Sequence, residues 1–270
     1  MPPAPTRATA EPVPRPCGAL GCRVFDTPEQ AFAFVLERSP RVLAIGEAHA
    51  PKGAKGIDSA VRRFTRTLLP LVAPHARALV VELPVSDGRC GGSEHRLDEV
   101  REEVSREQSE TNPNEYVELA RVARDLGVTP YPLRLTCNQF AAIARAGQND
   151  IDQALTLVAE TMSHQVQQHL QRSTTGLVLT YGGALHNDVT PEPNHERWSF
   201  GPALRQATGD AYVELDLIVP EYIQRNDNWQ ALEWTRHFDP RAYPDAAILY
   251  EPTPNSFVMV FPRSRAVAAE

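Results

Sequence analysis

Apolar segments of strand type and amphipathic segments of helix type alternate along most of this chain, and this alternation constrains the fold more than any other feature. Short continuous apolar runs, such as Val42–Ile45 and RALVVELP, are typical of strands covered on both faces. Between them, segments such as IDSAVRRFTRTLLPLV space their apolar residues as one helix face does. Strands that alternate with helices build a largely parallel sheet. The sequence therefore predicts an α/β fold with a mostly parallel central sheet and helices on both faces.

Three other segments complete this prediction. The two prolines in VTPYPLRL suit an edge strand, because proline cannot donate a ladder hydrogen bond. AAILYEP and SFVMVFP, with Pro254 and Asn255 between them, predict a C-terminal β-hairpin. The beginning of the chain is rich in Pro, Ala and Arg, which is typical of a flexible segment. We expect a flexible lead over residues 1–22 and a single α/β domain over residues 23–270.

Composition narrows the classes of partner. The net charge of -7 argues against a nucleic-acid binder, which needs a basic surface to neutralise phosphates. No apolar run approaches the roughly 20 residues that span a bilayer. The Pro-rich lead is typical of a segment that follows an export signal or lipid anchor. We therefore expect an exported protein, in the periplasm or as an outer-membrane lipoprotein with its signal removed, and the cytoplasm stays open as the alternative.

Polar side chains follow four predicted strands at their carboxyl ends, where open parallel sheets bind ligands. Each alone has a simpler interpretation, such as a salt-bridge partner or an ordinary loop residue. Their convergence at one edge of the sheet favours a functional cleft, because titrating groups that lie close together mark such sites. The residues are Glu47 and His49 after the first strand, Glu82 after the second, Arg134 after the third, and Tyr181 and His186 at the fourth.

Three of these motifs carry a resemblance to known proteins. Gly46-Glu47-Ala48-His49, the strand-terminal Glu82 and Gly183-Ala184-Leu185-His186 resemble, in order and coarse spacing, motifs of one superfamily. It joins haem-binding uptake proteins of the ChaN type, the erythromycin esterases and the TIKI/TraB proteins. The resemblance covers Arg41 to about Leu217 and implies a ChaN/EreA-like fold with its pocket at these residues. GEAHAPKG lacks the further acidic or His residues that often follow in the ChaN type, and the acidic loop after Glu82 has no counterpart that we recognise.

The first functional hypothesis is hydrolysis of an ester or peptide bond in a small-molecule substrate. His49 would act as the general base, since an imidazole titrates near neutral pH. Glu47 or Glu82 would orient it, and His186 or Arg134 would bind the developing oxyanion. Two Glu and two His also form a nitrogen and oxygen ligand set suited to Zn²⁺ or Mn²⁺. The TIKI-type resemblance implies a metal at Glu47, His49, Glu82 and His186, and the esterase type implies His-based ester cleavage.

Two other hypotheses stay open at this point. The ChaN resemblance implies a haem-binding protein of iron uptake, with Tyr181, His186 and His95 as candidate axial ligands. The domain could instead be a non-catalytic binding module of the cell envelope. The sequence does not choose among these functions and predicts no oligomeric state.

The four cysteines form no CxxC pair, which argues against a structural zinc site. Cys90 lies in the loop after the second predicted strand, and Cys137 lies just after the third. We predict a disulfide between them in an exported protein. Buried free thiols are the alternative.

Overall fold

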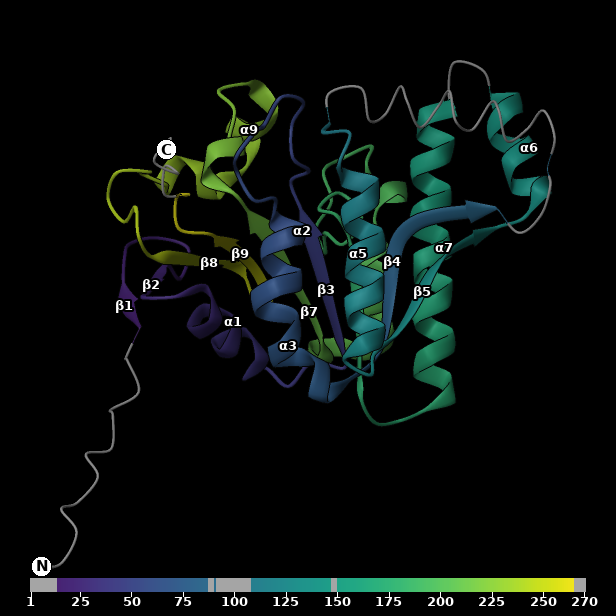
Figure 1. Ribbon diagram of the computed structural model, residues 1–270, viewed down its shortest axis with the longest axis horizontal. Helices are drawn as coiled ribbons and strands as arrows, with labels where there is room; N and C mark the ends of the chain where they lie inside the picture. The colour runs from purple at the N-terminus through teal and green to yellow at the C-terminus, as the bar shows by residue number, and fades with distance from the viewer. Residues whose placement is uncertain (1–13, 87–89, 91–107, 147–149, 265–270) are drawn as a thin grey trace, which may run out of the picture.

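The computed structural model describes residues 14–86, 90, 108–146 and 150–264. Within these residues the chain forms a nine-stranded sheet in the order β1-β2-β8-β9-β7-β3-β6-β4-β5 (Figure 1). The strands are β1 (Arg15–Pro16), β2 (Arg23–Phe25), β3 (Val42–Glu47), β4 (Ala76–Ser86), β5 (Thr129–Leu135), β6 (Leu177–Gly183), β7 (Tyr212–Ile218), β8 (Ala247–Thr253) and β9 (Ser256–Val260).

The α-helices are α1 (Pro28–Leu36), α2 (Ala60–Arg63), α3 (Leu69–Val72), α5 (Asn112–Asp125), α6 (Cys137–Ala146), α7 (Asp150–Arg172), α8 (Gly201–Thr208) and α9 (Asp227–Ala231). A π-helical turn, η1 (Phe64–Leu68), joins α2 to α3. Short 3-10 turns are η2 (Ala73–His75), η4 (Glu196–Trp198), η5 (Gly209–Ala211), η6 (Pro220–Tyr222) and η7 (Glu233–His237).

The sheet confirms the predicted α/β class. The pairings β7–β9, β3–β7, β3–β6, β4–β6 and β4–β5 are parallel, whereas β1–β2, β2–β8 and β8–β9 are antiparallel. The antiparallel β8–β9 pair is the predicted C-terminal hairpin, and the proline-containing β5 lies at the predicted edge. The result is a large, mostly parallel mixed sheet.

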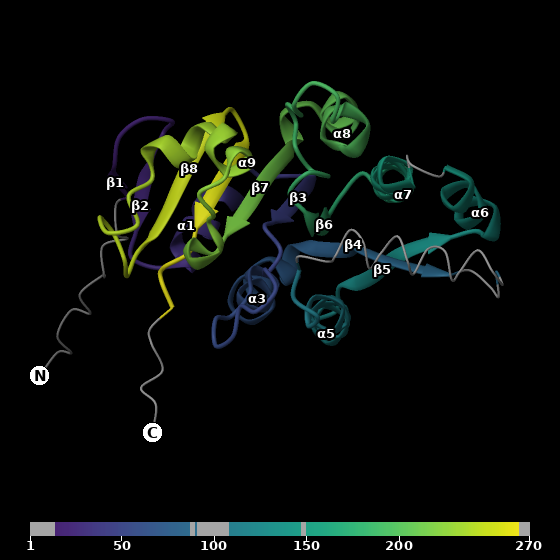
Figure 2. The same cartoon turned by 90° about the horizontal axis from the view of Figure 1, so that it is seen from above.

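Helices cover both faces of this sheet (Figure 2). Successive strand residues point to opposite faces, so β3 contributes to two separate apolar layers. Leu43 and Ile45 pack in the layer that includes α1, α2, α3 and α5, and Val42 and Ala44 pack in the layer that includes α7 and α8. This two-sided burial explains the continuous apolar run of the β3 sequence.

The predicted lead is wrong for residues 14–22, which belong to the fold. Arg15 and Pro16 pair with Val24 and Arg23 and so extend the sheet beyond β2. A disulfide between Cys17 and Cys22 closes the turn between the two strands. These two interactions hold a proline-rich segment whose composition alone is typical of a flexible chain. Residues 1–13 lie outside the described residues.

A second disulfide joins Cys90 to Cys137, the pair for which the sequence predicts one, with Cα atoms 5.1 Å apart. It links the segment after β4 to the start of α6 across 47 residues of sequence. In the part of the chain that the structure describes, no helix is both long and apolar enough to cross a membrane.

Candidate active site

The carboxyl ends of three neighbouring strands form the candidate site. In the order β3-β6-β4, strand β6 lies between the strand that carries Glu47 and the strand that carries Glu82. Glu47 is paired in register with Gly183 at the end of β6. The turn after β6 begins with a hydrogen bond from the Ala184 amide to the Glu47 carbonyl. The predicted meeting of these strand ends therefore follows from the strand order.

Glu47 is a buried carboxylate with both oxygens engaged. Its Oε2 accepts a hydrogen bond from the Tyr181 hydroxyl at 2.8 Å, and its Oε1 accepts one from the Tyr116 hydroxyl at 3.0 Å. The Nδ1 atom of His49 lies 3.0 Å from the same Oε1. Because a carboxylate accepts here, the Nδ1 atom carries the proton and the Nε2 atom of neutral His49 is the basic one. The two tyrosines thus fix the carboxylate that orients His49.

Glu82 reaches the site because β4 is irregular at this point. The sequence predicts that β4 ends at Glu82, and this is wrong, since β4 continues to Ser86. The pairing with β5 shifts register between Val81 and Pro84, so Glu82 lies in a bulge. Bulges redirect side chains out of the regular alternation. Here the Glu82 Oε2 atom accepts a hydrogen bond of 2.7 Å from the Gly183 amide.

His186 is held between two acceptors. Its Nδ1 atom lies 2.6 Å from the Trp198 carbonyl oxygen, and its Nε2 atom lies 3.4 Å from Glu82 Oε1. An imidazole with an acceptor at each nitrogen is stabilised as the doubly protonated cation. Only 4% of the His186 side chain is exposed, compared with 17% of Glu82 and 23% of His49. His49 and Glu82 are therefore the groups of this site that solvent reaches.

The charges around the site stabilise the ionised forms of His49, Glu82 and His186. Burial alone lowers the pKa of His49, but the hydrogen bond and charge of Glu47, together with the charge of Glu82, raise it above the ordinary 6.5. Burial opposes ionisation of Glu82, yet the His186 charge and hydrogen bond, the His49 charge and the Gly183 amide lower its pKa to about 2. Glu82 raises the pKa of His186 in the same way, against burial and the charge of His49.

The two accessible groups converge beside Gly183. A Cβ atom on Gly183 would stand 3.1 Å from His49 Nε2 and 3.7 Å from Glu82 Oε2, and the first of these distances is tighter than an ordinary contact. Because Gly183 has no side chain, the imidazole and the carboxylate can both lie close to its backbone. A basic nitrogen and an ionised carboxylate oxygen beside one residue can together bind a water molecule, as a general base requires.

Substitution of Glu47 by Gln is expected to lower the pKa of His49. Gln keeps a hydrogen-bond acceptor in place but removes the negative charge that stabilises the imidazolium. The measurement is a pH titration of the histidine ring signals by NMR spectroscopy. The exposed His164 on α7 serves as the internal control. An unchanged midpoint for His49 would show that Glu47 does not set its charge.

The structure does not bring every predicted residue to this site. Arg134 is exposed on β5 and paired in register with Val85, three residues beyond Glu82 on β4. Its side chain makes no hydrogen bond or ion pair with any described residue of the site. Its role as an oxyanion ligand stays a prediction. His95 lies outside the described residues.

The predicted cofactor ligands are placed differently from the expectation. Tyr181 is fully buried, donates its hydroxyl to Glu47, and has a pKa raised well above 10 by burial and by the Glu47 charge. Its hydroxyl is therefore already committed to Glu47 in this structure. His186 has both ring nitrogens engaged, as described above. Among the described residues, no three His, Cys, Asp or Glu side chains are grouped so that they could hold a metal ion. We therefore derive no step through a metal.

Sequence reasoning missed Tyr116 and a second acidic group on the opposite face of the sheet. Asp216 of β7 is paired in register with Gly46 and accepts a hydrogen bond of 3.0 Å from the Asn187 amide nitrogen. Glu214, two residues earlier, accepts from the Val189 amide. Burial raises the pKa of Asp216 to about 7 and the pKa of Glu214 well above its ordinary range. The signal was the pair of acidic residues alternating with apolar ones in YVELDLI.

Substitution of Asp216 by Asn is expected to stabilise the protein at pH 8 but not at pH 4. A carboxyl whose pKa is higher in the folded state destabilises the protein as the pH rises from the pKa of the unfolded state to about 7. Asn carries no charge, and its amide can donate to the buried Asn187 Oδ1, which has no hydrogen-bond partner. Urea unfolding at both pH values measures the difference. Equal effects of the substitution at pH 4 and pH 8 would contradict this account.

Comparison with known proteins assigns no family. No protein-family model matches the chain, and no curated protein matches it. Among solved structures, the type III effector HopBA1 is similar with a TM-score of 0.42 and 11% identity, covering 96% of this chain and 100% of that one. A protein from Bacillus cereus is similar with a TM-score of 0.38 and 11% identity, covering 83% of this chain and 89% of that one.

Proposed function

We propose that the protein is a hydrolase of ester or peptide bonds in which His49 is the general base and Glu47 its orienting carboxylate. The observation that carries the proposal is the convergence of the basic Nε2 atom of His49 and the Glu82 carboxylate beside Gly183. The order of the GEAH, Glu82 and GALH motifs supports membership of the ChaN/EreA-like superfamily, in which the esterase branch fits this chemistry.

The proposed reaction uses water as the nucleophile. A water molecule beside Gly183 donates one hydrogen bond to His49 Nε2 and the other to Glu82 Oε2. As its oxygen attacks the carbonyl carbon of the substrate, its proton passes to His49 Nε2. The buried Glu47 charge stabilises the imidazolium through the Nδ1–H bond. His49 then returns this proton to the leaving alkoxide or amine, and the carbonyl re-forms as the acid.

His186 acts on this reaction through Glu82. Its two N–H groups point at the Trp198 carbonyl and at Glu82, so it keeps Glu82 ionised and fixes one of its oxygens. The other oxygen accepts a hydrogen bond from the Gly183 amide and lies beside the proposed water. His186 is thus a positioning residue in this proposal, and the predicted role as an oxyanion ligand is not needed.

The test uses Gly183→Ala, a change that removes no functional group. The added methyl would stand 3.1 Å from His49 Nε2 and would take space from the proposed water, so hydrolysis of p-nitrophenyl esters and of peptide substrates should fall at least about 100-fold. The His49 titration midpoint, measured by NMR spectroscopy, should stay raised because the contact with Glu47 is made by Nδ1, the other ring nitrogen. Full activity in this variant would refute a reaction at Gly183.

The other two hypotheses predict different outcomes in the same preparation. Activity that disappears with a chelator and returns with Zn²⁺ or Mn²⁺ would replace the metal-free reaction with a metal-dependent one. A Soret band on titration with haemin, without hydrolysis, would favour a haem-binding function. A protein that shows no hydrolysis, no metal-dependent activity and no haemin binding would be a non-catalytic binding module.

The two disulfides support an exported protein, because disulfides persist in oxidising compartments. Reduction should therefore destabilise the folded chain. The Cys90–Cys137 bond closes the longer loop, so its loss should have the larger effect.

A further inference from the structure

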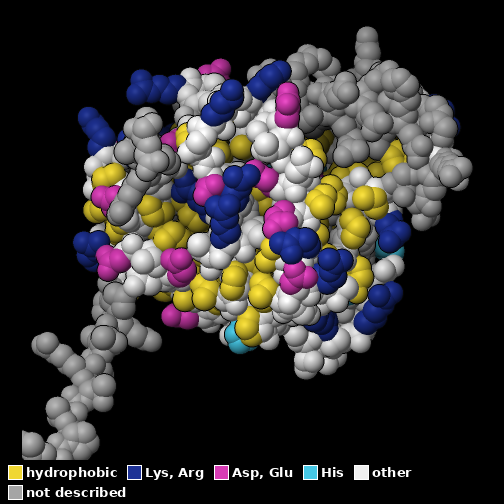
Figure 3. All heavy atoms as spheres, viewed as in Figure 1, with side chains coloured by type: hydrophobic (Ala, Val, Ile, Leu, Met, Phe, Trp, Pro, Cys, Tyr) yellow, Lys and Arg dark blue, Asp and Glu magenta, His cyan; other side chains and the backbone are white. Residues whose placement is uncertain are grey.

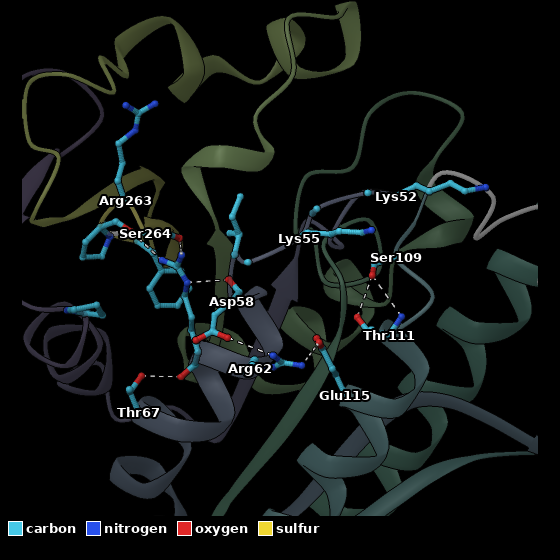
Figure 4. A pocket seen from close by; sticks show the side chains of 18 of the residues that line it. Lys52, Lys55, Asp58, Arg62, Thr67, Ser109, Thr111, Glu115, Arg263 and Ser264 are labelled. Carbon is cyan, nitrogen blue, oxygen red and sulfur yellow. Dashed lines mark hydrogen bonds and ion pairs between the residues drawn. The ribbon is translucent and has the colours of Figure 1, made fainter. Parts of the chain in front are cut away.

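A cavity of about 1020 Å³ lies outside the candidate active site and is lined by none of Glu47, His49, Glu82 and His186. Small-molecule sites in proteins commonly have volumes of roughly 300–1,000 Å³. The walls come from the beginning of α1, from the stretch that runs from the loop after β3 through α2 into η1, from the beginning of α5 and from the segment after β9 (Figure 4). Four segments that are far apart in sequence therefore line this space.

Both lysines of the chain lie in this wall. Lys52 and Lys55 are the only lysines among 27 basic residues, and both belong to the loop sequence PKGAKG. Gly53 and Gly56 of this loop have φ angles of 81° and 74°, and an added Cβ at either would meet no atom within 4 Å. Backbone conformation, not crowding, is thus what favours glycine at these two positions. The loop has a defined path that carries both ammonium groups at the cavity.

The described residues do not neutralise the two lysines. Neither Lys52 nor Lys55 makes a hydrogen bond or ion pair with any described residue. The carboxylate of Glu115, which also lines the cavity, is already engaged by Arg62 at 2.8 Å and by the Ser59 hydroxyl.

Asp58, a further acid of the lining, is paired with Arg66 at 3.0 Å and with Arg62 at 3.4 Å. On the face seen in Figure 3, basic and acidic side chains are interspersed in this way. Two lining carboxylates, Glu29 and Glu110, have no ion-pair partner among the described residues. Three lining cations, the two lysines and Arg263, likewise have none among these residues. The uncompensated balance of the lining is therefore positive in a chain whose net charge is -7.

Two hydroxyl groups line the cavity together with the lysines. In the view of Figure 4 the Lys55 side chain points toward Ser109, whereas the Lys52 side chain points away from the other labelled residues. Ser109 Oγ and Thr111 Oγ1 lie 3.0 Å apart in front of α5. Thr111 occupies the N-cap position of this 14-residue helix, but its side chain makes no capping hydrogen bond. Together these groups offer an anion one ammonium and two hydroxyl donors at one corner of the cavity.

We propose that this cavity binds a small molecule through an anionic phosphate or carboxylate group held by Lys55, Ser109 and Thr111, with Lys52 at the entrance. The remaining volume accommodates the uncharged part of the ligand. The site stands apart from the proposed hydrolysis, although both share α5, where Glu115 lines the cavity and the next residue, Tyr116, donates to Glu47. An occupied cavity would hold the start of α5 and therefore the orientation of Tyr116.

The lysine content makes a selective test practical. Reductive methylation with ¹³C-formaldehyde keeps the positive charge and labels only two side chains and the α-amino group. Titration with inorganic phosphate should shift the Lys55 signal saturably, and sodium chloride at the same ionic strength should not. Lys52→Arg and Lys55→Arg variants assign the two signals. Titration with citrate distinguishes carboxylate from phosphate recognition.

Affinity is measured by calorimetry on the unlabelled protein. The double variant Lys52→Ala/Lys55→Ala should bind the effective anion about tenfold more weakly or worse, since two charge-assisted contacts are lost. Arg124→Ala/Arg172→Ala, which removes two exposed cations from α5 and α7, is the matched control and should bind normally.

Shifts that rise linearly with either salt, or equal affinity in the two double variants, would overturn the proposal. Hydrolysis of an uncharged ester should persist in Lys52→Ala/Lys55→Ala. Failure of the anion site is therefore distinguishable from failure of the proposed hydrolase.

Discussion

Replacement of His49 by Gln is expected to lower kcat/KM for ester or peptide hydrolysis by about 10²–10⁴-fold, the usual contribution of a general base. Gln has nearly the same reach, but it cannot accept the proton of the attacking water. The buried Glu47 keeps its two tyrosine donors in this variant, so no buried charge loses all of its partners. The loss should therefore appear in catalysis with little change in the urea midpoint.

The matched control for this prediction is His164→Gln. His164 is exposed on α7, where its contact is with Gln168, and the substitution should leave the rate unchanged. Hydrolysis by His49→Gln at the rate of the unchanged protein would exclude His49 as the base. That result would favour the haem-binding protein or the non-catalytic binding module over a hydrolase.

Gly46→Ala is expected to destabilise the protein by about 3 kcal/mol or more, at the upper end of overpacking effects. The backbone of Gly46 is not in the left-handed region, so the cost comes from space alone. An added Cβ would lie 2.5 Å from both Asn187 Oδ1 and Asp216 Oδ1 and 2.7 Å from the Ala184 Cα atom. A backbone atom among these neighbours cannot rotate away. Urea unfolding measures the effect.

Gly127→Ala provides the comparison, because the reason for glycine is reversed there. Gly127 has a φ of 85°, and nothing lies within 4 Å of its added Cβ. Its cost should be only that of the left-handed conformation, about 1–2 kcal/mol. A smaller loss for Gly46→Ala than for Gly127→Ala would contradict the close packing between the GEAH strand and the turn after β6.

The sequence predicts what depends on local pattern. Apolar runs locate the strands of the parallel sheet, and prolines mark β5 as an edge strand. The rule that parallel sheets bind ligands at their carboxyl edge points to Glu47, His49, Glu82 and His186. Their juxtaposition then requires only that β6 lie between β3 and β4, as it does.

The parts that the sequence does not predict depend on contacts distant in the chain. Tyr116 lies 69 residues from the Glu47 that it contacts, and nothing in a helical segment marks one tyrosine as a buried donor. The bulge that turns Glu82 toward Gly183 has no sequence signal of its own. The β1–β2 pairing is hidden by a composition typical of flexible segments.

The cavity beside α2 and α5 illustrates the same limit. The sequence shows two lysines close together, but not that both line a cavity with Ser109 and Thr111. Only the path of the chain after β3 brings these side chains to the beginning of α5. The net charge of the whole chain is negative, and by itself it would predict a cationic ligand instead of an anionic one.

The pH dependence of hydrolysis, compared between the unchanged protein and Glu47→Gln, tests the central claim most directly. A base must be neutral to accept a proton, so kcat/KM should rise with pH through a midpoint above 6.5. That midpoint should coincide with the NMR titration of His49 and should move to lower pH in Glu47→Gln, with a reduced plateau. A rate that does not follow the His49 titration, or a midpoint that Glu47→Gln leaves in place, would contradict a Glu47–His49 base.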